Sequence, residues 1–192
     1  MSIERSFLPI ANKHALTARK KMGLLPDAAL CPFKYTQYRG FSVLKLTDLM
    51  EHDPRALGLL TKTENRKPVF SATTLLDAQG QNILGFVVND THKLERQKSN
   101  LAHEWGHVLQ AHKPQNLLQT RQEIHSKREE AEADAVGFAL LMTYEMCIRM
   151  AEEGLSDRII SAKYGISYPA VKLRMNRSYA RKLVDAKKED AA

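Results

Sequence analysis

Residues Leu101–Gln110 read LAHEWGHVLQ and carry two histidines four residues apart, with a glutamate directly after the first. Apolar side chains recur at helical spacing through this stretch, which predicts a helix that begins after Asn89–Thr91 and ends before Pro114. Residues four apart lie on the same face of a helix, one turn from each other. His103 and His107 therefore present two imidazoles on one side, where both can bind one metal ion.

The pattern His-Glu-x-x-His predicts metal-assisted hydrolysis. Zinc suits the pattern because imidazole is a zinc ligand and bound zinc lowers the pKa of its water to about 7. Glu104 directly follows His103, and it can act as general base on such a water without being a ligand. The alternative is a pair of histidines hydrogen-bonded within a core. The position of the motif on an amphipathic helix directly after a strand favours the metal site.

A catalytic zinc usually has three protein ligands and one open position, so a third ligand must come from elsewhere. No histidine completes the extension H-x-x-G-x-x-H, and His112 has the wrong spacing. The best source is REEAEADAVGFALLM (128–142), which predicts a second helix and offers the acids Glu129, Glu130, Glu132 and Asp134. A solvated first helical turn explains Glu129 and Glu130 well. It explains Glu132 less well, because Glu132 borders the apolar side, where a lone carboxylate needs a partner.

The remaining sequence predicts an α+β fold, a small antiparallel sheet beside a helical majority. We expect Ala133 and Gly137, which are small, to let the second helix approach the motif helix closely. The other predicted elements are a helix at 5–25, a strand at 41–46, a short helix within 47–60, a hairpin of strands 69–76 and 83–88, and one long helix over about 123–152.

The segment NDTHKLERQKSNLAHEWGHVLQAH (89–112) resembles the ImmA/IrrE family of zinc metallopeptidases. In that family an asparagine ends a strand, an Arg-Gln pair precedes the active helix, and the helix carries A-H-E-x-x-H. Asn89, Arg96-Gln97 and Ala102–His107 match in this order. The second family motif, an E-x-E-A-D pattern with a small and apolar run, matches Glu130–Met142. The resemblance spans about residues 40–178.

The resemblance implies that His103, His107 and Glu132 bind Zn²⁺ and that Glu104 is the catalytic base. It also implies a zincin-like core of the gluzincin type, in which the third ligand comes from a later helix. Two departures stand out. Trp105 occupies a position that usually holds a smaller aliphatic residue, so we expect it to narrow the cleft. Thr143 replaces the proline that ends the family's second motif, which puts the end of that helix in question.

The C-terminal stretch SDRIISAKYGISYPAVKLRMN (156–176) resembles a helix-turn-helix unit. Lys172, Arg174 and Arg177 would project from its second helix, and contact with DNA follows from that arrangement. The alternative is that these helices pack on the peptidase and only share the shape. From Asp157 to the end the chain has nine Lys or Arg against four Asp or Glu, which fits either a binding role or a solvated face.

The composition bounds these hypotheses. The chain has 192 residues and a 43% hydrophobic content, which predicts a folded core. Its net charge of +7 indicates a nucleic-acid partner, an acidic protein partner or simply solubility. Two cysteines do not make a disulfide framework, and they suit a reducing cytoplasm. No signal peptide or membrane span is predicted. We expect three parts: an N-terminal helical segment at 1–40, a metallopeptidase core at 41–153 and a basic helix-turn-helix-like region at 154–192.

Two functions remain open from the sequence. The first is a cytoplasmic zinc endopeptidase, and the resemblance implies that it cuts a helix-turn-helix repressor and thereby controls stress-response or mobile-element genes. Its substrate would lie along an edge strand formed by 69–76 or 83–88. Candidates for oxyanion stabilisation are His92, His125 and Tyr144. The second function is a DNA-binding regulator with a structural or sensory zinc site, for which Glu104 would be dispensable.

Overall fold

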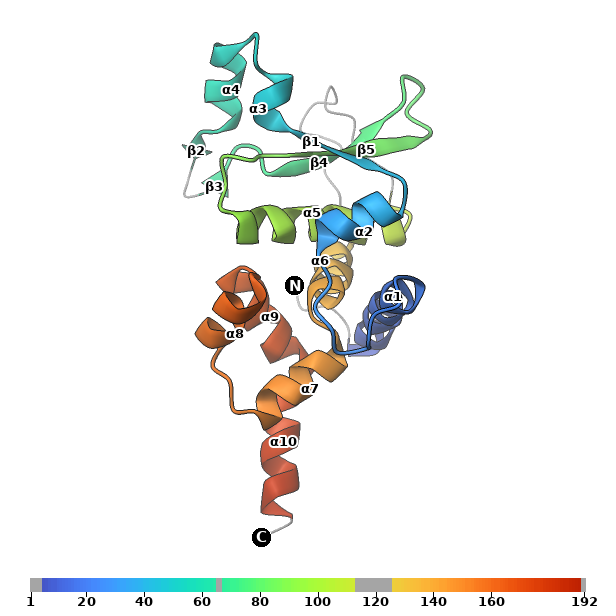
Figure 1. Ribbon diagram of the computed structural model, residues 1–192, viewed down its shortest axis with the longest axis vertical. Coiled ribbons are helices and arrows are strands. Elements are labelled where there is room, and N and C mark those ends of the chain that lie inside the picture. Colours follow the sequence, from blue (N-terminus) through green and yellow to red (C-terminus); the bar gives the residue numbers. More distant parts are fainter. Residues whose placement is uncertain (1–4, 65–66, 113–125, 191–192) are drawn as a thin grey trace.

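The computed structural model describes residues 5–64, 67–112 and 126–190, which form a small sheet above a larger helical body (Figure 1). The strands are β1 (Ser42–Lys45), β2 (Thr63–Glu64), β3 (Lys67–Pro68), β4 (Ala72–Leu76) and β5 (Ile83–Val88). The helices are η1 (Arg5–Phe7), α1 (Leu8–Lys21), α2 (Pro32–Tyr38), α3 (Leu46–Leu49), α4 (Pro54–Leu60), α5 (Leu94–Leu109), α6 (Lys127–Leu141), α7 (Tyr144–Glu152), α8 (Asp157–Tyr164), α9 (Tyr168–Ser178) and α10 (Ala180–Glu189). This mixed content agrees with the predicted combination of helices and strands.

The main sheet has the strand order β1-β5-β4, with β5 in the centre. The predicted hairpin is confirmed, because β4 and β5 pair antiparallel. The prediction of an all-antiparallel sheet is wrong for β1, which pairs parallel with β5. The reason is the long connection between β1 and β5, since only a short turn forces antiparallel neighbours. Gly85 in β5 faces the backbone of Ser42 so closely that a Cβ would not fit there.

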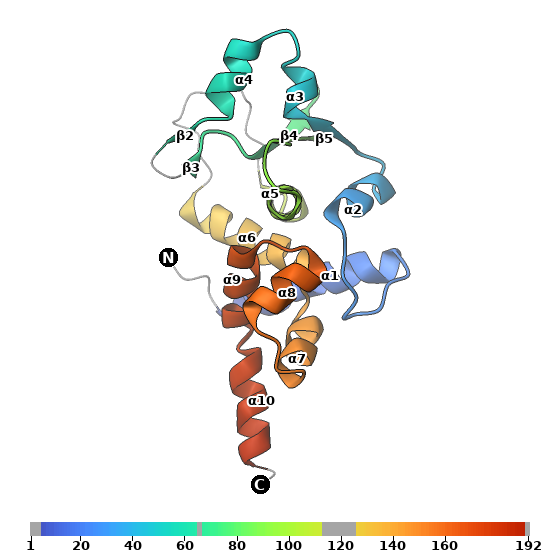
Figure 2. The same ribbon diagram turned by 60° about the vertical axis from the view of Figure 1, so that its left-hand side comes forward.

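Helix α5 lies between the sheet and α6, as the two views in Figures 1 and 2 both show. Its apolar face carries Trp105, whose ring is fully buried and packs against Tyr35, Phe41 and Phe86. The indole Nε1–H donates to Thr36 Oγ1 over 2.7 Å, so the polar atom of this buried side chain is paired. Trp105 therefore belongs to the core beneath the sheet, and the expectation that it narrows the cleft is wrong.

Helices α5 and α6 touch through their backbones. A Cβ on Gly106 would overlap the backbone of Ala133, and a Cβ on Gly137 would overlap the backbone of Ala102. The predicted close approach at Ala133 and Gly137 is thus confirmed. The contact fixes how the side chains of the two helices face each other.

The predicted long helix over 123–152 is broken into α6 and α7. Met142 has extended backbone angles, with φ −138° and ψ 105°, and Thr143 then caps α7 by accepting a hydrogen bond from Met146 N. Thr143 Oγ1 also donates to Pro26 O over 2.8 Å. Because a threonine N-cap starts a new helix without any Gly or Pro, apolar periodicity alone could not locate the break.

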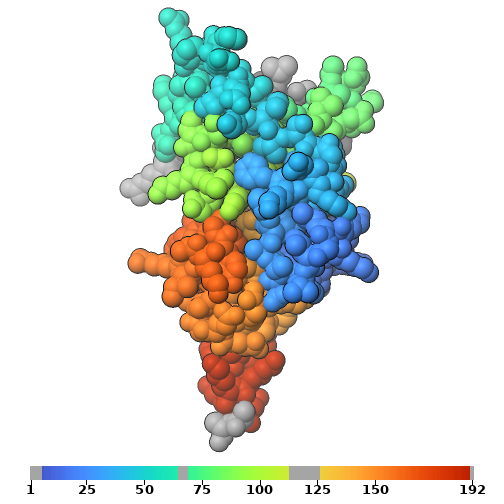
Figure 3. Space-filling model, in the orientation of Figure 1, coloured from blue at the N-terminus to red at the C-terminus, as the bar shows by residue number. Residues whose placement is uncertain are grey.

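The C-terminal helices form a separate lower layer, and α10 extends from it to make the narrow end of the molecule (Figures 1 and 3). Helix α8 ends at Gly165, which adopts left-handed angles, and α9 follows after Ser167. Arg174 of α9 is buried, and its Nε–H donates to Met142 O over 2.7 Å. The prediction that Arg174 projects toward DNA is therefore wrong, because its guanidinium is used to satisfy the end of α6.

Two short stretches differ from the sequence prediction. The single short helix expected within 47–60 is two helices, α3 and α4. Helix α2 was not predicted, and it begins with Pro32 at its first position and buries Tyr35 beneath Trp105. Among the described residues, no helix has both the length and the apolar character needed to cross a membrane.

Candidate metal centre

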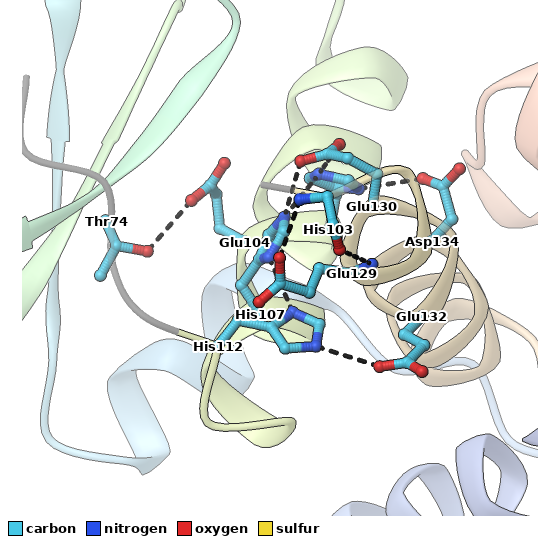
Figure 4. A network of polar contacts seen from close by, with 10 residues as sticks. Thr74, His103, Glu104, His107, His112, Glu129, Glu130, Glu132 and Asp134 are labelled. Carbon is cyan, nitrogen blue, oxygen red and sulfur yellow. Dashed lines mark hydrogen bonds and ion pairs between the residues drawn. The ribbon is translucent and has the colours of Figure 1, made fainter. Parts of the chain in front are cut away.

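Three metal-binding side chains converge where α5 faces α6 (Figure 4). His103 and His107 come from α5, and Glu130 comes from α6. The two imidazole Nε2 atoms are 3.1 Å apart, and the Glu130 carboxylate oxygens lie 3.5 Å from His103 Nε2 and 3.6 Å from His107 Nε2. One ligand atom from each residue lies within 4.8 Å of the other two. A single ion placed among them can contact all three.

The helix geometry explains this convergence. Residues 130, 133, 134 and 137 follow the spacing that places side chains on one helical face. The close backbone contacts of Ala133 and Gly137 turn that face toward α5. Glu130 and Asp134 are therefore directed at the histidine pair. The same register of small residues was present in the sequence, and it would have indicated Glu130 as the nearest carboxylate.

Glu132 lies elsewhere, on a different side of α6. Its Oε2 is 3.2 Å from His112 Nε2, and its Oε1 accepts a hydrogen bond from Arg128 Nε over 2.8 Å. The structure thus brings Glu130 to the histidine pair and does not bring Glu132 there. Glu132 is only 15% exposed, as expected for an acid on the inward border of the helix, but its partners are His112 and Arg128.

Asp134 orients His103. His103 Nδ1 lies 2.9 Å from Asp134 Oδ1, so the carboxylate accepts the Nδ1 proton and the ring is oriented with Nε2 toward the cluster. Burial disfavours a charged imidazole, but the hydrogen bonds to Asp134 and Glu130 and the neighbouring carboxylates raise the pKa of His103 to about 10. The surrounding carboxylates therefore favour positive charge at this position.

The donor set fits zinc. Two imidazole nitrogens and one carboxylate oxygen are a known ligand set of catalytic zinc, which leaves a position for water. The Nε2 atoms of His103 and His107 face each other at hydrogen-bonding distance. If each ring carries its proton on Nδ1, two lone pairs and a carboxylate meet with no proton between them. A divalent cation at this point removes that repulsion.

Glu104 lies beside the cluster without belonging to it. Thr74 Oγ1, from strand β4, donates a hydrogen bond to Glu104 Oε2 over 3.0 Å (Figure 4). Burial raises the pKa of the Glu104 carboxyl, although the charge of His103 and the Thr74 hydrogen bond oppose this effect. A carboxylate with a raised pKa next to a metal site is suited to accept and return a proton.

A cavity of about 360 Å³ opens over these residues. Strand β4 forms one wall, and the opposite wall includes His103, Glu104, His107 and Glu130. A larger cavity of about 770 Å³ lies between α1, α9 and α10, and none of the three clustered ligands or Glu104 lines it. We place the site in the smaller cavity, because the metal-binding and acid–base groups decide the chemistry and volume does not.

The strand order distinguishes between the two strands that were expected to bind substrate. Strand β4 is an edge strand and borders the cavity, whereas β5 is paired on both sides. Of these two strands, β4 is the one with an edge left unpaired by the described residues, where a peptide could add as a further strand. Of the two expectations, 69–76 agrees with the geometry, and 83–88 does not.

The two described oxyanion candidates, His92 and Tyr144, do not line the cavity. His92 precedes α5 and contacts Asn100 of that helix, and Tyr144 lines the larger cavity near α9. His125 lies outside the described residues.

Asn89, which the family resemblance marks, is fully buried and donates to Phe70 O over 3.0 Å, so it braces the end of β5. The residues at the site that sequence reasoning did not assign are Thr74, Glu130, Asp134 and His112.

A family model matches the part of the chain that holds these residues. Residues 71–176 match the model of peptidase family M78, the IrrE N-terminal-like domain, over more than half of the chain. The chain belongs to this family. The resemblance to ImmA/IrrE proteins is thereby confirmed. Membership of family M78 indicates that the protein is a metallopeptidase. Comparisons with curated proteins and with solved structures found no significant match.

Proposed function

We propose that this M78 protein is a zinc-dependent endopeptidase in which His103, His107 and Glu130 hold the metal and Glu104 is the general base. One observation carries the proposal: the three ligands converge next to a cavity that also holds Glu104. The third ligand comes from a helix later in the chain, as in the gluzincin arrangement of zincin-like enzymes. Glu130 takes the place that the sequence resemblance gave to Glu132, because Glu130 faces the two Nε2 atoms and Glu132 does not.

The side chains divide the chemistry among them. Bound zinc would supply a Lewis acid for the peptide carbonyl and would lower the pKa of water. Glu104 takes a proton from the attacking water and returns it to the leaving amine. Thr74 orients the Glu104 carboxylate through its hydrogen bond. Asp134 orients the His103 ring through Nδ1, so that Nε2 would be available to hold the metal.

The substrate binds in extended form along β4. This strand is the edge of the sheet and forms the wall opposite the catalytic residues. A peptide that pairs with its backbone would present a carbonyl to the cavity, and the recognition would depend on main-chain hydrogen bonds.

We further propose a cytoplasmic transcriptional repressor of the helix-turn-helix type as the substrate, with a role in regulated gene expression such as a stress response. The support is the resemblance to the ImmA/IrrE family, whose members cut such repressors. Cys31 and Cys147 are both free thiols, which fits a reducing compartment.

The alternative of a DNA-binding regulator has weaker support. Of the three basic residues that would form its interface, Lys172 is exposed, but Arg174 is buried against the end of α6. Arg177 lines the cavity beside α1. Since α9 does not present these side chains as one outward face, we do not propose DNA contact through them.

Native mass spectrometry with added zinc tests the proposed function. The parent should bind one zinc, and Glu130→Gln should lose it or bind it far more weakly. Glu104→Gln should keep the zinc and fail to cleave a repressor substrate, because it retains the ligands and lacks the base. A Glu104→Gln variant that cleaves as fast as the parent, or a Glu130→Gln variant with unchanged zinc affinity, would contradict the proposal.

A further inference from the structure

His107 is connected to Glu132 through a second imidazole. His107 Nδ1 lies 2.9 Å from His112 Nδ1, and His112 Nε2 lies 3.2 Å from Glu132 Oε2 (Figure 4). The side chains of His107 and His112 are each 7% exposed, and that of Glu132 is 15% exposed. The three groups thus form a shielded row that starts at the candidate metal centre and ends at a carboxylate.

The far end of the row is held in place. Glu132 Oε1 accepts a hydrogen bond from Arg128 Nε over 2.8 Å, one turn earlier on α6. The guanidinium N–H of Arg128 donates to one carboxylate oxygen, and the imidazole of His112 faces the other. With a cationic donor on one oxygen, the Glu132 carboxylate is the acceptor in both contacts.

The direction of each hydrogen bond in the row follows from the role of the Glu132 carboxylate as an acceptor. The proton between Glu132 and His112 must be on His112 Nε2. In the neutral form of His112, which carries one N–H, Nδ1 is then a lone pair and accepts. The proton between the two rings then belongs to His107 Nδ1, which leaves His107 Nε2 as a lone pair directed at Glu130 and His103.

Each of the two histidines therefore has a hydrogen-bond acceptor for its Nδ1 proton, but the two acceptors differ. His103 donates its Nδ1 proton directly to Asp134. His107 donates its Nδ1 proton to His112, and the carboxylate of Glu132 contacts His112 and not His107. In metal sites the partner of the distal ring nitrogen fixes the tautomer and orientation of a ligating histidine.

We propose that His112 and Glu132 are positioning residues for His107, which hold its ring and its tautomer ready to bind the metal. This inference rests on the proposed zinc site. It gives Glu132 a function that explains its inward position on α6 without making it a ligand.

Zinc affinity, measured by competition with a chromophoric chelator, tests the proposal without depending on activity. Glu132→Gln and His112→Phe should each weaken zinc binding by about 10- to 100-fold. The control is Glu152→Gln, which removes a carboxylate from an exposed position on α7 and should leave the affinity unchanged. Circular dichroism and thermal unfolding establish that each variant is folded.

The double variant separates a relay from two independent effects. Because His112 and Glu132 act through one row of hydrogen bonds, the combined loss of affinity should equal the larger single loss and should not be the product of the two. If Glu132 were itself the third ligand, Glu132→Gln would weaken binding as much as Glu130→Gln and His112→Phe would leave it unchanged. That result would overturn the proposal.

Two failures can be told apart. A parent that binds zinc, with both variants unaffected, overturns the relay and leaves the zinc site standing. A parent that binds no zinc overturns the proposed function and the relay together. Nitrogen NMR of the histidine side chains gives a second readout: the Nδ1–H tautomer of His107 should dominate in the parent, and its absence there would also overturn the proposal.

Discussion

At the scale of single residues, the role of each polar side chain at the site depends on its hydrogen-bond partner. The motif itself identified His103, Glu104 and His107, because the spacing of the pattern is enough to place two imidazoles on one helical face. The choice among the acids of α6 depended on the rotation of that helix about its own axis. Hydrophobic patterning marked Glu132 as inward, and it could not tell a metal ligand from a carboxylate that binds His112.

Thr74 gives a prediction at this scale. Thr74→Val removes the hydroxyl that donates to Glu104 and keeps the shape of the side chain. We expect kcat to decrease by about tenfold, which corresponds to about 1.4 kcal/mol of lost orientation of the base, while zinc content stays at the parent level. Steady-state kinetics with a repressor substrate measures the effect.

The matched variant Thr74→Ser restores a hydroxyl at the same position. It should recover most of the parent kcat. A Thr74→Val enzyme that cleaves at the parent rate would show that the hydroxyl does not orient Glu104.

At the scale of elements, helices and strands followed from periodicity, and their relative placement followed from small residues. The pairing of β4 with β5 was predictable from the turn chemistry between them. The parallel pairing of β1 was not, because it is a long-range contact that leaves no local pattern. The break between α6 and α7 was missed for a related reason: Thr143 caps the start of α7 and Arg174 donates to Met142 O at the end of α6, without the Gly or Pro that usually marks such a point.

The contact between α5 and α6 gives a prediction at this scale. Gly137→Ala places a methyl group against the backbone of Ala102, so the two helices must separate. We expect a loss of about 1–3 kcal/mol in the free energy of unfolding. Zinc binding should weaken as well, because α6 carries Glu130. Urea unfolding and chelator competition measure the two effects.

Gly58 provides the control for that change. It lies in α4, and a Cβ added there would meet nothing within 4 Å. Gly58→Ala should therefore leave zinc binding unchanged and stabilise the protein by about 0.4–1 kcal/mol. Equal effects of the two alanine substitutions would rule out a special role for the helix contact.

At the scale of the whole molecule, the N-terminal and C-terminal helices meet at the end of α6. Arg19 of α1 is fully buried and donates to Leu141 O over 3.4 Å, and Arg174 of α9 donates to Met142 O. Both guanidinium groups supply donors and positive charge where a helix ends with unpaired carbonyls. The division of the chain at 40 and 153 remains a prediction, and these contacts cross both boundaries.

Arg174 gives a prediction at this scale. Arg174→Met keeps the length of the side chain but leaves the carbonyl of Met142 without its donor. We expect a loss of about 2–4 kcal/mol in the free energy of unfolding. The exposed neighbour Lys172→Met is the control and should change stability by less than about 0.5 kcal/mol. Similar urea midpoints for the two variants would contradict the structural role of Arg174.

The backbone contact at Gly106 and Gly137 has a consequence for how the metal is acquired. Because the two helices already touch, the entropy of gathering three ligands is lost when the chain folds and not when the ion arrives. The apoprotein should therefore keep its native circular dichroism spectrum after chelation. Adding the ion back should restore binding within the mixing time, without any refolding phase. A zinc finger behaves in the opposite way, since its chain orders only around the ion.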